Sequence, residues 1–214
     1  MIVLKVIKIC CIMILWENDN LQTSDMCVRG FFVGGKEKLI MDRNVQIITD
    51  LDGKKFVIIN DIIFKGKQHI KWNDVENYLK NYIGDFFEIA ETSDIVYIGK
   101  DLPDEYVWSE YTKKLKGTLA KAKANAVQGI PEMVEIATDK RHKENLKYSH
   151  RKTAEKGWYR YNIRFALPVY NNLDVLEHYN IFDAVLIVRH ASDDKLYLYD
   201  IINIKKKKQS KPLE

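Results

Sequence analysis

The residues with the clearest potential for chemistry lie at positions 147–165, in the segment KYSHRKTAEKGWYRYNIRF. This segment contains one histidine, five aromatic residues, three lysines and three arginines. Cations bind phosphate, flat rings stack on bases, and an imidazole transfers protons, so this composition suits contact with nucleic acid. An amphipathic strand with an aromatic core face and a solvated basic face has the same pattern and is the structural alternative.

The distribution of charge favours the nucleic-acid interpretation. Residues 109–164 carry 14 Lys or Arg and 6 Asp or Glu, a net charge of +8. Residues 1–108 carry a net charge of −4, and residues 165–214 are neutral. A clustered basic surface is typical of a protein with a polyanionic partner. A solvated helix face also carries such charges, so both interpretations stay open.

The composition as a whole is that of a globular protein from a reducing cytosol. The chain has 214 residues, of which 46% are hydrophobic and 30% are charged. Its three cysteines form no disulfide framework and have no zinc-ligand spacing. Its five histidines also lie in no ligand-spaced motif. The sequence therefore predicts neither a metal nor a cofactor.

The first 40 residues differ from the rest of the chain. The apolar run at residues 9–16 is too short to span a membrane, and no small-residue cleavage site follows it. We expect residues 1–40 to be an extension or an added strand. We do not expect the protein to associate with a membrane. A later translation start at Met41 is a further alternative. Residues 41–214 are predicted to form a single domain with a basic C-terminal tail.

The hydrophobic pattern predicts an α+β fold, in which helices pack on a C-terminal antiparallel sheet and a β-hairpin and helix precede them. Residues 158–165 alternate, with Trp158, Arg160, Asn162 and Arg164 on one side of a strand. The polar stretch at 139–149 is either helix or loop. The expected elements are strands at 45–49, 55–59, 62–65 and 95–98, a helix at 72–83, further helices within 103–147, and strands at 158–168, 180–190 and 195–204.

Several phrases, taken together in this order, resemble domains of large polyvalent proteins from phages and conjugative elements. Some such domains are grouped with the barnase/EndoU/colicin/RelE-like nuclease fold, in which helices precede an antiparallel sheet that carries the active residues. The resemblance covers about residues 45–210 and implies a cytoplasmic protein of a bacterial host cell. The phrases are YIGKDLPDEY (97–106), YTKKLKG (111–117), KAKANA (121–126), GWYRY (157–161), RFALPVY (164–170), VRHA (188–191) and LYDIINIKK (198–206).

This resemblance implies metal-independent RNA cleavage, in which the 2′-OH attacks, one group accepts its proton and another protonates the leaving oxygen. His150 and His190 are the candidates for proton transfer, because imidazole titrates near neutral pH. Arg164 is the candidate for holding the phosphate and Tyr199 for donating a hydrogen bond or a proton. The candidate nucleic-acid-binding residues are Lys121, Lys123, Arg151, Lys152, Trp158, Arg160 and Arg189.

Each candidate also has a structural interpretation. His190 is a strand-end histidine beside a turn, His150 lies in a polar run, and lysines such as Lys121 and Lys123 commonly solvate a helix face. Three functions therefore stay open. The first is an RNase-like effector of a mobile element. The second is a non-catalytic, anti-CRISPR-like inhibitor that binds a host defence protein or nucleoprotein, and the third is an accessory nucleic-acid-binding module.

Overall fold

The computed structural model describes residues 43–50, 52–66, 69–145 and 154–210. The predicted boundary near residue 40 lies outside this part of the chain and stays a prediction. The elements in chain order are β1 (Val45–Thr49), β2 (Lys55–Ile59), α2 (Trp72–Lys80), β3 (Phe86–Ile89), β4 (Asp94–Tyr97), α3 (Leu102–Trp108), α4 (Glu110–Lys113), α5 (Gly117–Ala126), the 3-10 helix η2 (Val127–Gly129), α6 (Ile130–Glu135), β5 (Thr138–Lys143), β6 (Trp158–Tyr170), β7 (Leu176–His190) and β8 (Leu196–Ser210).

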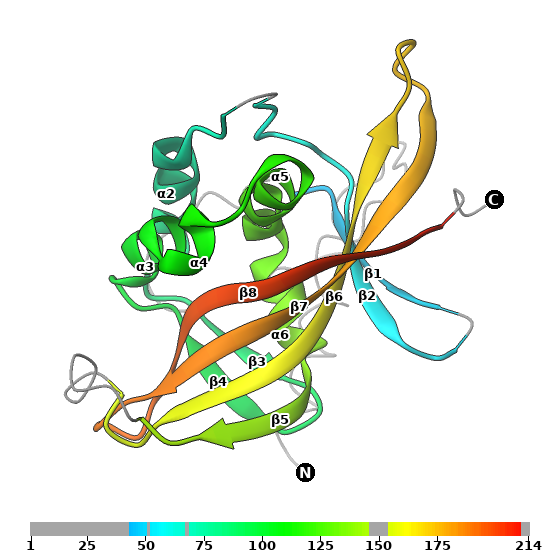
Figure 1. Cartoon of the computed structure of the whole chain (residues 1–214). Coiled ribbons are helices and arrows are strands. Elements are labelled where there is room, and N and C mark those ends of the chain that lie inside the picture. The colour runs from blue at the N-terminus through cyan, green and yellow to red at the C-terminus, as the bar shows by residue number, and fades with distance from the viewer. Residues whose placement is uncertain (1–42, 51, 67–68, 146–153, 211–214) are drawn as a thin grey trace, which may run out of the picture. The chain divides into compact units, whose positions relative to one another are not determined.

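One mixed sheet of eight strands organises the described chain. Its order is β1-β2-β6-β7-β8-β4-β3, and β5 pairs with the part of β6 that β2 leaves open. The three long strands β6, β7 and β8 form an antiparallel meander at its centre (Figure 1). This confirms the predicted pairing of the last three strands, which extend further than expected along the chain.

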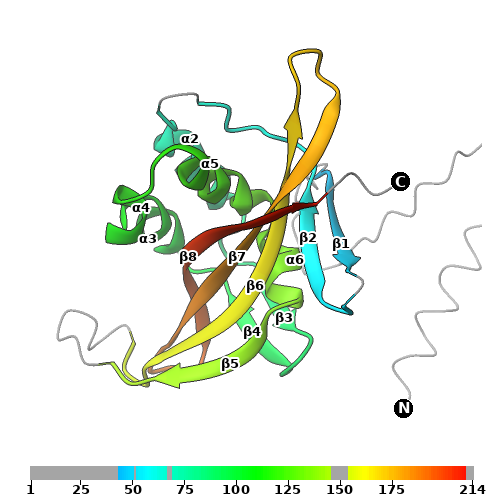
Figure 2. The same cartoon turned by 45° about the vertical axis from the view of Figure 1, so that its right-hand side comes forward.

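The two faces of the long strands have different environments. On β6, Tyr161, Ile163 and Phe165 are buried, whereas Arg160, Asn162 and Arg164 are not. The buried side chains join the main hydrophobic core, to which α2, α3, α5 and α6 also contribute residues. Helices α2 to α5 lie together beside β8 (Figure 2). We call the side of the strands with Tyr161, Ile163 and Phe165 the inner face and the arginine-bearing side the outer face. The predicted alternation along residues 158–165 is therefore confirmed.

Small residues let the helical layer approach the sheet closely. The alanines of α5 at positions 122, 124 and 126 are fully buried. A Cβ atom added at Gly129 would lie 3.1 Å from a side-chain carbon of Val57 and 3.2 Å from one of Ile59. Glycine is therefore the residue that fits between α5 and α6, where the chain contacts β2.

The sheet differs from the expectation of a purely C-terminal, antiparallel one. The N-terminal hairpin joins it through a parallel pairing of β2 with β6, and β4 pairs in parallel with β8. Residues 62–65 are not a strand, because the side-chain amide of Asn125 donates to the backbone carbonyl of Phe64 and accepts from its N–H. Residues 138–143 form the strand β5, which is exposed along its whole length and so has no apolar alternation to reveal it.

Within the described residues, the structure contains no helix that is long and apolar enough to cross a membrane.

Candidate functional site

The outer face of the sheet brings together most of the predicted binding residues that the structure describes. Trp158 and Arg160 on β6 lie on the same side of the strand as Arg164. Trp158 is directly opposite Arg189 of β7, and its ring lies 4.9 Å from the ring of Tyr199 on β8 in an edge-to-face arrangement. Three neighbouring strands therefore place arginines and aromatic rings on one surface.

The guanidinium of Arg189 is already occupied by an acidic partner. Its Nη2 atom donates to Oδ1 of Asp101 at 3.2 Å, and the side chain is only 14% exposed. The guanidinium carbon also lies 5.0 Å from the centroid of the Tyr197 ring. Arg189 therefore anchors the loop before α3 to the sheet, and most of its charge is compensated within the protein.

Arg164 has two acidic partners. Its Nη1 atom lies 2.7 Å from Oδ2 of Asp50, and its Nε atom lies 3.3 Å from Oδ1 of Asp183. The pKa of Asp50 is lowered, first by the backbone N–H of Lys54 and then by Arg164. The predicted phosphate ligand is thus flanked by carboxylates, which compete with phosphate for the guanidinium.

Arg160 differs from the other two arginines of this face. Within the described part of the chain its guanidinium has no hydrogen-bond or ion-pair partner, although a buried Nε atom without an acceptor is a feature it shares with Arg189. It lies directly opposite Arg141 of β5. Sequence reasoning missed Arg141, because it belongs to a fully polar stretch in which no periodicity indicates a strand. The arrangement concentrates positive charge at the β5–β6 pair.

Tyr199 is held by a carboxylate from the helical layer. Its hydroxyl donates to Oε2 of Glu105 at 2.6 Å. Burial, followed by the neighbouring Glu105, raises the pKa of Tyr199 far above its ordinary value. The hydroxyl therefore stays protonated at neutral pH. It can donate a hydrogen bond, but its proton is already shared with Glu105.

His190 lies away from the outer-face arginines. The residue before it, Arg189, faces outward, and the His190 ring packs instead 5.7 Å from the ring of Tyr159, which contacts the main core. Its Nε2 atom is 3.4 Å from a carboxylate oxygen of Asp194. The His142 ring also packs on Tyr159, with 5.1 Å between the two ring centroids. The histidine and the outer-face arginines therefore do not share one pocket.

The remaining predicted binding residues fall into two groups. Lys121 is half-buried on α5, in the helical layer and not on the outer face. His150, Arg151 and Lys152 lie outside the described residues, so their predicted roles stay predictions. The pairing of His150 with His190 as base and acid belongs to this second group.

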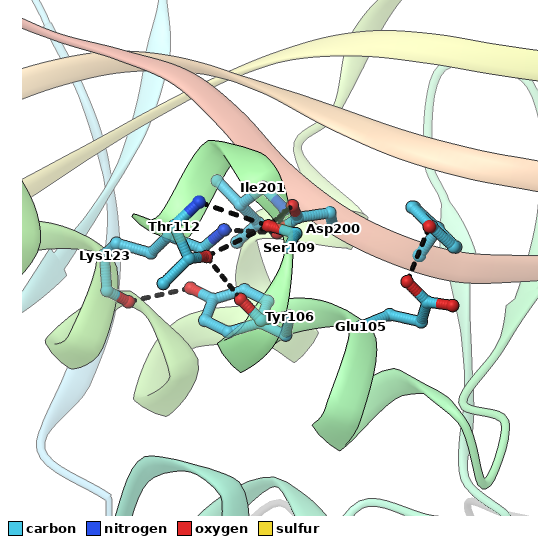
Figure 3. A network of polar contacts seen from close by, with 8 residues as sticks. Glu105, Tyr106, Ser109, Thr112, Lys123, Asp200 and Ile201 are labelled. Carbon is cyan, nitrogen blue, oxygen red and sulfur yellow. Dashed lines mark hydrogen bonds and ion pairs between the residues drawn. The ribbon is translucent and has the colours of Figure 1, made fainter. Parts of the chain in front are cut away.

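Lys123, which the sequence predicts to bind nucleic acid, does not lie on the surface of the protein. The side chains of Lys123 and Asp200 are both 0% exposed, and Nζ lies 2.5 Å from Oδ1 (Figure 3). Tyr106 donates a hydrogen bond to the Lys123 carbonyl at 2.7 Å, and its ring centroid lies 4.5 Å from Nζ. The amino group therefore points into the protein and away from any surface ligand.

Asp200 is the centre of this buried network. Its Oδ2 atom accepts from Ser109 Oγ at 2.9 Å, and its Oδ1 atom accepts from the backbone N–H of Ile201 at 2.7 Å. Burial raises the pKa of Asp200 to about 6, although Lys123 and Ser109 act in the opposite direction. Burial likewise lowers the pKa of Lys123. The ion pair ties α5 to β8 and has the features of a structural contact.

The described residues contain no group of three or more His, Cys, Asp and Glu side chains that could hold a metal ion. Comparison with protein-family models, with curated proteins and with solved structures gave no significant match.

Proposed function

We propose that this chain is a nucleic-acid-binding domain, with RNA as a better ligand than DNA, and that the outer face of the sheet is its binding surface. The observation that carries the proposal is the placement of Arg160, Trp158 and Tyr199 on one face, with Arg141 beside them. Arginines contact phosphates, and aromatic rings stack on unpaired bases, which are the usual target of RNA recognition.

The setting of this function follows from the sequence resemblance. Phrases such as GWYRY and VRHA resemble domains of phage and conjugative-element proteins. They support a role in the cytoplasm of a bacterial host, acting on nucleic acid there. Metal-independent RNA cleavage is the catalytic form of the proposal. It requires His150, which lies outside the described residues, and the position of His190 supports binding more strongly than cleavage.

A titration of the full chain against labelled oligonucleotides tests the binding. Fluorescence anisotropy with a fluorescein-labelled 12-nucleotide single-stranded RNA, at low salt, is expected to show micromolar or tighter binding. The same RNA sequence as DNA is expected to bind more weakly. Affinity should fall steeply with salt, by about 0.7 in logarithmic slope for each phosphate contacted. Absence of binding to either oligonucleotide at micromolar protein concentrations would refute the proposal.

A matched pair of variants separates the outer face from general basicity. Arg160→Gln removes a cation from the proposed surface and should weaken RNA binding. Lys71→Gln removes one exposed cation just before α2, in the helical layer, and should leave the affinity unchanged. Equal losses in both variants would mean that attraction is diffuse and that the outer face has no special role.

A protein-binding inhibitor is the second candidate, and one observation favours it. A small apolar hollow of about 190 Å³ lies between α4 and β8, lined mainly by Tyr111, Leu115 and Ile201–Ile204. Tyr111 and the nearby Trp108 are large side chains with substantial exposure. Substituting Tyr111 by Ser should reduce binding to a protein partner and leave RNA affinity unchanged.

A further inference from the structure

The outer face contains a cross-strand pair of arginines with incomplete charge compensation. Arg141 of β5 is the direct partner of Arg160 of β6 in the antiparallel register. Directly opposed residues of such a pair project from the same face, with Cβ atoms about 5 Å apart. Like charges at this spacing repel each other and destabilise the strand pair unless an anion lies nearby.

The other outer-face arginines of β6 and β7 have acidic partners, whereas Arg160 has none among the residues that the structure describes. Arg164 contacts two carboxylates and Arg189 one. In the described chain, the only carboxylate in contact with the Arg141–Arg160 pair is that of Asp139, whose Oδ2 atom lies 3.4 Å from Arg141 Nε. One carboxylate, which contacts Arg141 alone, therefore accompanies two guanidinium groups, and the pair retains an excess positive charge.

Neighbouring side chains hold this pair in position. Asn162 accepts a hydrogen bond from Arg141 Nη2 through Oδ1, and its Nδ2 atom donates to Asp139 at 2.8 Å. The amide thus fixes the orientation of the exposed arginine. On the other side of the pair, the Nε–H of Arg160 is buried and has no acceptor. The Nε–H of Arg189 is buried without an acceptor in the same way, so the feature that distinguishes Arg160 is that no carboxylate among the described residues contacts its guanidinium.

We propose that Arg141 and Arg160 bind one phosphate group between them. Each guanidinium offers a planar set of donors that matches the oxygens of phosphate, and the anion would offset the repulsion between the two charges. Lys143 lies opposite Trp158 in the next row of the same strand pair and adds positive charge beside the site. The inference rests on the proposed function where it assigns this phosphate to an RNA backbone.

The arrangement predicts opposite effects on binding and on stability. Removing Arg141 also breaks its contacts with Asp139 and Asn162. Removing Arg160 breaks no ion pair among the described residues and relieves the repulsion, so without an anion the melting temperature should rise or stay constant. With RNA present, the same substitution removes a charge-assisted contact and should weaken binding by ~10-fold. A purely structural arginine would instead lower the melting temperature when it is removed.

The experiment uses the full chain with Arg141→Gln and Arg160→Gln as test variants and Lys71→Gln as the control. Melting temperatures are measured in phosphate-free buffer and with 20 to 50 mM inorganic phosphate, with chloride matched for ionic strength. Wild type and control are expected to gain stability in phosphate, and both test variants to lose that gain. Arg141 is exposed, so its variant keeps the test valid if Arg160→Gln does not fold.

The same proteins titrated with the 12-nucleotide RNA distinguish the two sources of phosphate. If both test variants lose the stabilisation by phosphate and also bind RNA ~10-fold more weakly, the site binds a phosphate of the RNA backbone. A phosphate effect that depends on both arginines, without RNA binding by wild type, supports a clamp for free phosphate and refutes the proposed function alone. If both variants bind RNA as wild type does, and phosphate stabilises none of the proteins, Arg141 and Arg160 do not bind phosphate together, and the proposed function is left in place.

Discussion

The buried ion pair of Lys123 with Asp200 gives the sharpest test of the fold. Lys123→Met keeps a long unbranched side chain but leaves the Asp200 carboxylate without its cation. The pair is fully buried, with 2.5 Å between its charged atoms, and Asp200 also bonds Ser109 and the backbone at Ile201. Because no solvent reaches this site, water cannot take the place of the missing ammonium.

The expected loss follows from the cost of an uncompensated buried charge. Removing one partner of a buried ion pair lowers the free energy of unfolding by about 3–5 kcal/mol, whereas replacing both partners is often close to neutral. Lys123→Met should therefore destabilise strongly, and adding Asp200→Asn should restore most of the loss. Lys121→Met, two residues away on α5 and half-buried, is the matched control and should change stability by less than ~0.5 kcal/mol.

The loss should also depend on pH in a defined direction. In the wild type, Asp200 has a pKa of about 6 in the folded state against an ordinary value of 3.8. The folded state therefore binds the proton more tightly, and stability from this group falls as pH rises through that interval, then becomes constant. Without Lys123 the folded pKa rises further, so the decline continues above pH 6 at up to about 1.4 kcal/mol per pH unit. The deficit of Lys123→Met should widen from pH 6 to pH 7.

Urea denaturation followed by tryptophan fluorescence and far-UV circular dichroism, at pH 5, 6 and 7, measures these differences. The double variant also serves in the RNA titration, where it should bind like wild type because Lys123 is buried. A deficit for Lys123→Met of less than ~1 kcal/mol that does not change with pH would show that the pair is not formed in solution. The placement of α5 against β8 would then be wrong.

Two further predictions concern packing and the histidine. Gly129→Ala should lower the free energy of unfolding by about 1–3 kcal/mol, because the added methyl group would crowd Val57 and Ile59. Urea denaturation measures this loss. An unchanged urea midpoint would contradict the close contact with β2. His190→Ala should change RNA affinity less than twofold in the anisotropy titration, because the His190 ring packs on Tyr159 and not beside the outer-face arginines. A loss of RNA affinity close to that of Arg160→Gln would place the RNA on the other side of the sheet.

The alternation along β6 shows what local sequence can predict. Two-residue periodicity at 158–165 determines which side chains share a face, so the outer position of Arg160 and Arg164 and the inner position of Tyr161 and Phe165 were predictable. The alternation does not determine what covers each face. The strand β5, which contributes Arg141, has only polar residues. Only its pairing with β6 identifies it as a strand.

Lys123 shows where local reasoning fails. In the segment KAKANA it has the same alanine neighbours as Lys121, and nothing nearby distinguishes a buried lysine from a half-exposed one. The difference comes from Asp200, which is 77 positions away. Small neighbours let α5 approach β8 closely enough for this contact. Whether a lysine in an Ala-rich helix is buried or exposed therefore depends on its partner in the folded protein. The local sequence pattern does not identify that partner.

Tertiary ion pairs also reduce the net charge of +8 that residues 109–164 present to a ligand. Two of its cations have carboxylate partners outside the segment: Lys123 pairs with Asp200, and Arg164 pairs with Asp50. Ion pairs between distant segments thus neutralise part of the charge that the count would assign to a polyanion. Binding should follow the cations without acidic partners, and Arg160 is the outer-face arginine in the described chain that meets this condition. If RNA affinity instead followed total charge, Arg164→Gln would weaken it as much as Arg160→Gln, whereas the ion pairs predict a smaller effect.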